Sequence, residues 1–382
     1  MLAAHKKFVL SRVTEILLLA ALAILAFGSG SLLISDIIAF WANSSDLPWT
    51  IELAVVLLAL AAIIKCAQIL FHGWLLQVME APTPISALLH AGIINIGGFL
   101  LLRFADVLAL ASFAQWLLLI VGALTAIIAS LTLMTRISIK VMLAWSVCAQ
   151  MGFMLMEIAL GFYILALLHL VAHSFYKASS FLSSGDIVDS HIRSARDGSH
   201  GSSRGWHWLV SGSLITGIIA LLIGIAQFFG IAGEMTWGTM IVSTILAIGI
   251  TIFIAESLRY PLQWLYGLVA LSGLSVLSLY LPSQQLFSTI TAGLFPQLAV
   301  TQAQVSVVML AFSLFFLLFV ARQLWPNGGL SRRLYPIIYA SLYLDEWFYH
   351  RLLHYWSCKQ LPQKLTETSH SHPQPIANGS TS

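Results

Sequence analysis

Residues 54–74 read AVVLLALAAIIKCAQILFHGW, an apolar run in which Lys65 is the only lysine, arginine or acidic residue. A helix needs about 20 mostly apolar residues to cross the hydrocarbon core of a bilayer. This run is long enough, and it lacks the alternating polarity of a barrel strand. It therefore predicts a helix that spans a membrane.

The rest of the chain repeats this pattern. We predict an all-α, polytopic transmembrane helix bundle of about ten spans, since runs of sufficient length and hydropathy occur at residues 15–34, 51–76, 84–103, 111–132, 139–159, 162–184, 207–229, 237–256, 260–281 and 302–323.

Composition supports a membrane protein and excludes several function classes. The chain is 59% hydrophobic and 9% charged, whereas soluble domains carry about 25% charged residues. A net charge of +3 gives no reason to expect a nucleic-acid partner. Cys66, Cys148 and Cys358 are scattered and form no CxxC pair, so neither a disulfide framework nor a cysteine metal site is indicated. We expect no cofactor and no metal in this chain, and no glycine-rich fingerprint for nicotinamide or flavin is present.

Loop charges and polar segments predict the topology. Nearly all lysines and arginines outside the spans fall on the side that holds both termini, with Arg103 alone on the other, so we expect both termini in the cytoplasm. No removable signal peptide is indicated. The expected divisions are a cytoplasmic N-terminal segment (1–14), a transmembrane domain (15–323), a cytoplasmic loop within it (186–206), an amphipathic interfacial or partner-docking helix (331–358) and a disordered tail (359–382).

Lys65 is the first candidate for chemistry. It lies mid-run, roughly three turns from either end, where a charged ammonium costs at least about 3 kcal/mol. His72 follows two turns later on the same helix face. The alternative is a structural lysine that carbonyl groups satisfy at a helix break.

The next run begins with residues 72–84, HGWLLQVMEAPTP. Pro82 and Pro84 have no amide donors and favour an extended turn after Glu80, and a broken helix near a buried charge is a common transporter device. An ordinary loop with an exposed glutamate fits equally well. His90, in the span that follows, is either a functional group or a hydrogen-bonded packing residue.

The strongest cluster is HLVAHSFYKASSFLSSG at 169–185. His169, His173 and Lys177 stand at i, i+4 and i+8 and share one helix face, which favours a proton relay or a wet cavity wall. A metal site and a purely structural polar seam are the alternatives. Lys140, at the start of the preceding span, is either a further relay residue or an anchor that reaches the interface.

These motifs resemble those of the antiporter-like subunits of respiratory complex I and of Mrp-type cation/proton antiporters. The stretches 72–103, 139–154 and 169–185 match three of their motifs, in order, across about residues 50–190. In that family buried lysines and histidines relay protons. The resemblance implies relay roles for Lys65, His90, Lys140, His169, His173 and Lys177, and a structural or coupling role for Glu80, Pro82 and Pro84.

Several departures from that pattern are similar to the membrane subunit of DAB-type inorganic carbon transporters. Leu76 and Gln77 replace a Pro-Asp pair, and no lysine occurs in the span 207–229. The sequence opens at what resembles the sixth helix of the family core, so we expect an incomplete inverted repeat. Either Met1 is an internal start, or a separate chain supplies about five N-terminal helices.

The resemblance implies a membrane subunit that conducts protons or Na⁺ to drive inorganic carbon uptake. Its partner would be a large, carbonic-anhydrase-like subunit that holds the zinc, in a bacterial inner membrane. This is a transporter subunit rather than an enzyme. The alternatives are a proton-pumping subunit of an NADH–quinone oxidoreductase, an Mrp-type Na⁺/H⁺ antiporter subunit, and a chain that only scaffolds a partner.

Overall fold

The computed structural model describes residues 2–44, 47–185, 286–324 except 288, 297 and 299, and 328–344. These residues form α-helices and 3-10 helices, with no strand among them, which confirms the all-α fold class. The expected spans 207–229, 237–256 and 260–281, the loop 186–206, the tail 359–382 and the end of the segment 331–358 lie outside the described residues.

The described elements follow one another in chain order. They are α1 (Leu2–Ser29), α2 (Ile34–Ala42), α3 (Trp49–Lys65), α4 (Gly73–Gln77), η1 (Val78–Glu80), α5 (Thr83–Ala91), η2 (Ile93–Asn95), α6 (Ile96–Arg103), α7 (Ala105–Leu108), α8 (Ser112–Leu133), α9 (Ile139–Ala159), α10 (Tyr163–Leu182), α15 (Gln302–Leu324), α16 (Gly329–Tyr339) and η3 (Ser341–Tyr343).

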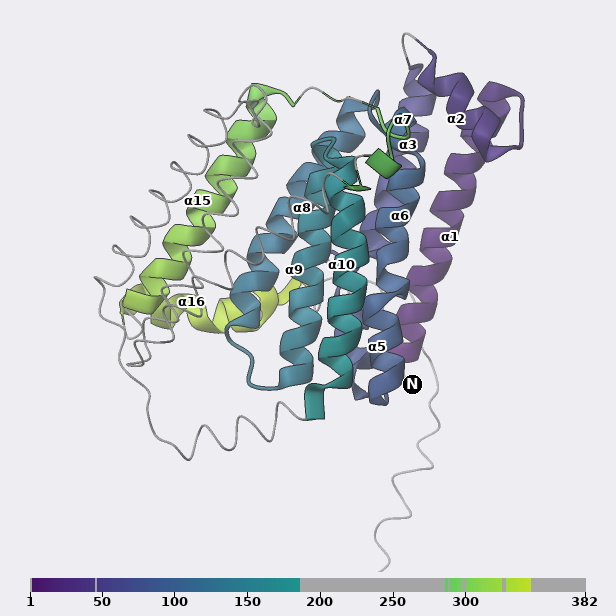
Figure 1. Cartoon of the computed structure of the whole chain (residues 1–382). Helices are drawn as coiled ribbons and strands as arrows, with labels where there is room; N and C mark the ends of the chain where they lie inside the picture. Colours follow the sequence, from purple (N-terminus) through teal and green to yellow (C-terminus); the bar gives the residue numbers. More distant parts are fainter. Residues whose placement is uncertain are drawn as a thin grey trace, which may run out of the picture.

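The long helices stand side by side as a bundle, and α16 runs crosswise near one end of it (Figure 1). In the part of the chain that the structure describes, five helices are long and apolar enough to cross a membrane: Lys6–Ser29, Thr83–Arg103, Ser112–Leu133, Ile139–Ala159 and Gln302–Ala321. α10 has 20 residues and packs between α5 and α9. The face that carries His173 and Lys177 points to these neighbouring helices, since both side chains are buried.

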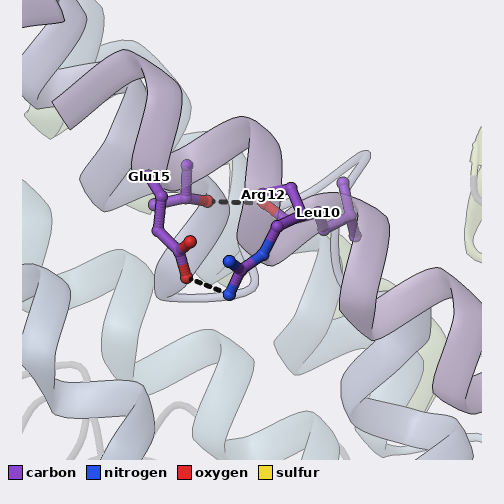
Figure 2. A network of polar contacts seen from close by, with 4 residues as sticks. Leu10, Arg12 and Glu15 are labelled. Carbon is purple, nitrogen blue, oxygen red and sulfur yellow. Dashed lines mark hydrogen bonds and ion pairs between the residues drawn. The ribbon is translucent and has the colours of Figure 1, made fainter. Parts of the chain in front are cut away.

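The first helix begins earlier than its hydropathy predicts. We expected a span at 15–34 after a separate segment 1–14, but α1 runs from Leu2 to Ser29. Polar side chains are accommodated within the helix: Arg12 pairs with Glu15 at 2.8 Å, and the Thr14 hydroxyl donates to the Leu10 carbonyl at 2.8 Å (Figure 2). Ion pairs at this three-residue spacing stabilise a helix, and the Thr14 hydroxyl finds its acceptor within the same helix.

The run 51–76 is not one helix, which corrects the predicted position of Lys65. α3 ends at Lys65 and α4 begins at Gly73, so the lysine is a helix terminus and not a mid-span residue. Ala67 and Leu70 adopt positive φ angles of 48° and 80° in between. Residues other than glycine rarely adopt this conformation, and tertiary contacts must hold it.

Small residues bring the helices of the bundle into close contact. At the crossing of α8 and α9, a Cβ on Gly122 would lie 2.6 Å from the Gly152 carbonyl oxygen, and one on Gly152 would lie 2.7 Å from the Gly122 oxygen. A Cβ on Gly97 would lie 2.5 Å from Cys66 Sγ. Close backbone approach of this kind is how small residues pack membrane helices, and here it fixes α9 against α8 and α6 against α3.

The described part of the amphipathic segment is helical and docks on the bundle. The Thr132 hydroxyl at the end of α8 donates to the Ile338 carbonyl at 3.1 Å, and Arg136 donates to the Tyr339 carbonyl. The Arg136 guanidinium lies 4.4 Å from the Tyr339 ring centroid and 5.6 Å from that of Trp145. The C-terminal end of α16 therefore lies against the α8–α9 connection, and the α-helix ends at Tyr339 instead of continuing along the predicted segment 331–358.

Candidate functional site

The helix α10 places three titratable side chains along one face. His169, His173 and Lys177 occupy successive turns, and the two imidazole rings lie 6.1 Å apart. Lys177 is 1% exposed and His173 is 4% exposed, while the side chain of His169 is 17% exposed. The predicted shared face is confirmed, and the side chains on it become more buried from His169 to Lys177.

α5 adds His90 beside this face. His90 is fully buried, its ring stacks on Phe181 of α10 at 4.4 Å, and neither ring nitrogen has a hydrogen-bond partner. Both ring nitrogens of His173 are likewise unpartnered. Buried polar atoms are nearly always hydrogen-bonded, so these four nitrogens distinguish His90 and His173 from packing residues.

α9 contacts this face at both ends. Lys177 Nζ donates to Ser146 Oγ at 2.6 Å, and the Ser146 hydroxyl donates to the Leu143 carbonyl at 2.7 Å. Eleven residues further along α9, Glu157 Oε2 lies 2.9 Å from His169 Nδ1. We call the set Glu157, His169, His173, His90, Lys177 and Ser146 the polar row. It lies where α10 packs against α9 and α5, three helices that are labelled in Figure 1.

A break in the α5–α6 helix fixes the position of His90. Gly92, with φ −120° and ψ −68°, ends the regular helix two residues after His90, and η2 follows. The Asn95 side-chain amide donates to the Ala91 carbonyl and to Ser174 Oγ, both at 2.8 Å. The Ser174 hydroxyl in turn donates to the Leu170 carbonyl at 2.8 Å. The break is thereby fastened to α10, next to the row.

The second break, residues 66–72 between α3 and α4, is a separate polar region. Its Ile69 amide donates to Thr125 Oγ1 of α8 at 3.1 Å, and Gln68 Nε2 donates to the Cys66 carbonyl at 3.1 Å. His72 is 1% exposed, and its ring centroid lies 4.9 Å from that of Trp145. Lys65, just before the break, is half-buried.

The structure brings together four of the six predicted relay residues. These are His90, His169, His173 and Lys177. Lys65 and Lys140 are half-buried, and no hydrogen bond or ion pair joins either one to the row within the described residues.

The predicted Pro-Thr-Pro turn is present, with Glu80 ending η1, Pro82 capping α5 and Pro84 in its first turn. α5 therefore starts at this turn. His90, seven residues after Thr83 in the same helix, is placed by that start.

Sequence reasoning assigned no role to Glu157, Ser146 or Asn95. Glu157 was the easiest to find, since it is the only acidic residue in α9 and lies in the apolar stretch MLMEIAL. Ser146 and Asn95 carry no such signal, because neutral polar residues are frequent in membrane helices as packing groups. Among the described residues no three His, Cys, Asp or Glu side chains gather to hold a metal ion, so the metal alternative for the histidines gains no support.

Comparison with known proteins identifies the family of the chain. A family model described as the transmembrane region of NADH:quinone oxidoreductase and Mrp antiporters matches residues 1–199. The chain is 36% identical over 386 aligned residues to the probable inorganic carbon transporter subunit DabB2 of Halothiobacillus neapolitanus, covering 98% of this chain and 69% of the relative. The chain belongs to this antiporter family.

Other members and a solved structure agree. This chain is 41% identical over 350 residues to the probable inorganic carbon transporter subunit DabB of Hydrogenovibrio crunogenus. The alignment covers 91% of this chain and 65% of the relative. It thus spans about two thirds of the length of these relatives. The Mrp complex from Dietzia sp. DQ12-45-1b shares the fold with a TM-score of 0.55 at 21% identity, over 95% of this chain and 45% of that one. The resemblance inferred from the motifs is confirmed, and the chain is a multi-pass membrane protein of a transport family.

Proposed function

We propose that this chain is the membrane subunit of an energy-coupled inorganic carbon transporter. Protons or other small cations move along the polar row, and their movement drives a partner subunit that handles carbon dioxide or bicarbonate. The observation that carries the proposal is the buried row itself, in which Lys177, His173 and His90 are at most 4% exposed. Ionisable groups inside membrane bundles are costly to bury and mark ion pathways.

The spacing of the row suits proton transfer. The contacts at its ends are 2.9 Å (Glu157–His169) and 2.6 Å (Lys177–Ser146), within direct hydrogen-bond range. The rings of His169 and His173 lie 6.1 Å apart, a gap that one water can bridge. A histidine can accept a proton on one nitrogen and release it from the other, which makes it suitable for the middle of such a path.

The half-buried lysines fit at the margins of this path. Lys140 begins α9, six residues before Ser146, and Lys65 ends α3 at a helix break. We assign both as outer relay residues, where the interior meets water. Glu80, Pro82 and Pro84 form the turn that starts α5, and we assign them a coupling role because movement of α5 would displace His90 relative to α10.

The proposed setting is a bacterial inner membrane with both termini in the cytoplasm. The partner is a large, carbonic-anhydrase-like subunit that carries the zinc and performs the chemistry, so the chain itself is not an enzyme. The relatives named as inorganic carbon transporter subunits support this assignment, since they align with 91% and 98% of this chain. The family description also covers NADH:quinone oxidoreductase and Mrp antiporter subunits, and these are the rival functions.

Growth of a carbonic-anhydrase-deficient bacterial strain in ambient air tests the proposal. We expect rescue when the protein is co-expressed with the proposed large, carbonic-anhydrase-like subunit, and loss of rescue with His173→Gln or Lys177→Ala. Arg12→Gln, on the exposed face of α1, is the matched control and keeps rescue. A wild-type complex that is present in the membrane and gives no rescue refutes the carbon function. Restored Na⁺ tolerance of an antiporter-deficient strain would then favour the antiporter.

A further inference from the structure

We propose that Glu157 is the terminal proton-exchanging group of the polar row, at the end opposite Lys177. This inference rests on the proposed function and extends it by one residue that the family motifs do not contain. It starts from the 2.9 Å contact between Glu157 Oε2 and His169 Nδ1.

The burial of Glu157 is the first argument. Its side chain is 4% exposed, although it lies only two residues before the end of α9 at Ala159. A glutamate so near a helix end could reach the surface, as long polar side chains in membrane proteins commonly do. Here it points inward to a histidine of the next helix.

The position of His169 is the second argument. With 17% of its side chain exposed, His169 is the most exposed of His169, His173 and Lys177. Its Nδ1 is hydrogen-bonded to Glu157. His173 lies next in line with both ring nitrogens unpartnered. The contacts from Glu157 through His169 to His173 therefore join the end of α9 to the buried face of α10.

A purely structural role for the pair is the competing explanation. The α9–α10 contact is already fixed by the Lys177–Ser146 hydrogen bond, and the Asn95–Ser174 bond ties α10 to the broken helix. A glutamine would give the same packing and a hydrogen bond without the cost of a buried carboxyl. A carboxyl group, unlike glutamine, can gain and lose a proton, and this is the role that we assign to Glu157.

The transfer balances in protons and charge. A proton that reaches Nε2 of neutral His169 from the His173 side gives an imidazolium ring, whose Nδ1 proton then passes to the Glu157 carboxylate. The products are a neutral imidazole and a neutral carboxylic acid, whose proton then passes to a water molecule near the end of α9. Inward transfer follows the same steps in reverse.

Proton flux into membrane vesicles that contain the full-length protein and its co-expressed large subunit tests the inference. A pH-sensitive dye reports the flux after an imposed pH gradient. We expect Glu157→Gln to lower the flux at least about tenfold at equal abundance and equal melting temperature, and Glu157→Asp to restore most of it. The matched control is Glu15→Gln, which alters an exposed glutamate on α1 (Figure 2).

The outcomes separate the two proposals. Wild-type vesicles that move no protons refute the proton-coupled form of the proposed function. If wild type conducts, His173→Gln does not and Glu157→Gln equals wild type, then Glu157 is structural and only this inference fails. If the Gln and Asp variants both lose abundance or melt early, the pair serves stability, and the inference fails as well.

Discussion

Two lysines of this protein, Lys177 and Lys65, occupy predicted membrane runs but lie in opposite surroundings. Lys177 is 1% exposed, five residues before the end of α10, and donates to a serine of α9. Lys65 is half-buried at the C-terminus of α3, where the partial negative charge of the helix end favours a cation. The comparison shows that a lone lysine in an apolar run does not by itself indicate a buried relay residue.

The two helix breaks differ in the same way. The break after His90 is fastened by Asn95 to α10 and therefore borders the row. The break after Lys65 is fastened by Thr125 to α8 and contacts Trp145 through His72. One break lies beside the titratable groups of the polar row, whereas the other contains the positive φ angles of Ala67 and Leu70.

Removal of the Lys177 amine is expected to have the largest effect. Lys177→Ala takes away the only charged group at the inner end of the row, so we expect carbon uptake to fall at least about tenfold, a barrier increase of about 1.4 kcal/mol. Lys65→Ala should lower uptake by a few-fold only, a barrier increase of about 0.5–1 kcal/mol. Lys65 is half-buried at a helix end, so water can take the place of its ammonium group there. Radiolabelled bicarbonate uptake at equal protein abundance measures both.

The order of these two effects is the informative result. Equal losses would mean that the row continues to Lys65 in the working protein and that the separation of the two regions is wrong. A larger loss at Lys65 would place the main path at the 66–72 break.

The Thr125 bond is expected to matter for stability rather than transport. Thr125→Val leaves the buried Ile69 amide without its acceptor, which costs about 1–3 kcal/mol. Thr14→Val is the matched control, because the Thr14 hydroxyl bonds only the carbonyl of its own helix (Figure 2). A lower melting temperature for Thr125→Val alone, measured in detergent, is the expected result. Equal melting temperatures would show that the break needs no support from α8.

The smallest effect is expected at Arg136, which joins the 66–72 region to the crosswise helix. Arg136→Gln removes the contacts with the Tyr339 ring and with Trp145, each about 0.5–1 kcal/mol for an exposed cation–π pair. We expect faster hydrogen exchange in 329–343 and uptake within twofold of wild type. Arg332→Gln, on the exposed face of α16, should leave exchange unchanged. A strong loss of uptake with Arg136→Gln would show that α16 acts on transport through Trp145 and His72.

Much of the candidate site was predictable along a single helix. The i, i+4, i+8 spacing of His169, His173 and Lys177 places them on one face wherever α10 packs. The stacking of His90 on Phe181 and the bonds to Ser146 and Glu157 were not predictable, because they join residues from 12 to 91 positions apart in sequence. The end of α3 was also missed, since hydropathy is continuous from residue 51 to 76 while the backbone is not.

The sequence by itself determined that the chain is helical and membrane-embedded, because apolar runs of bilayer length with almost no charge have no other stable form. It also singled out most of the titratable residues in those runs, since such residue types are rare there. Only the tertiary structure decided which of them meet. Burial and pairing depend on how helices cross, and at Gly122 and Gly152 that crossing is set by contacts between backbones that no local pattern encodes.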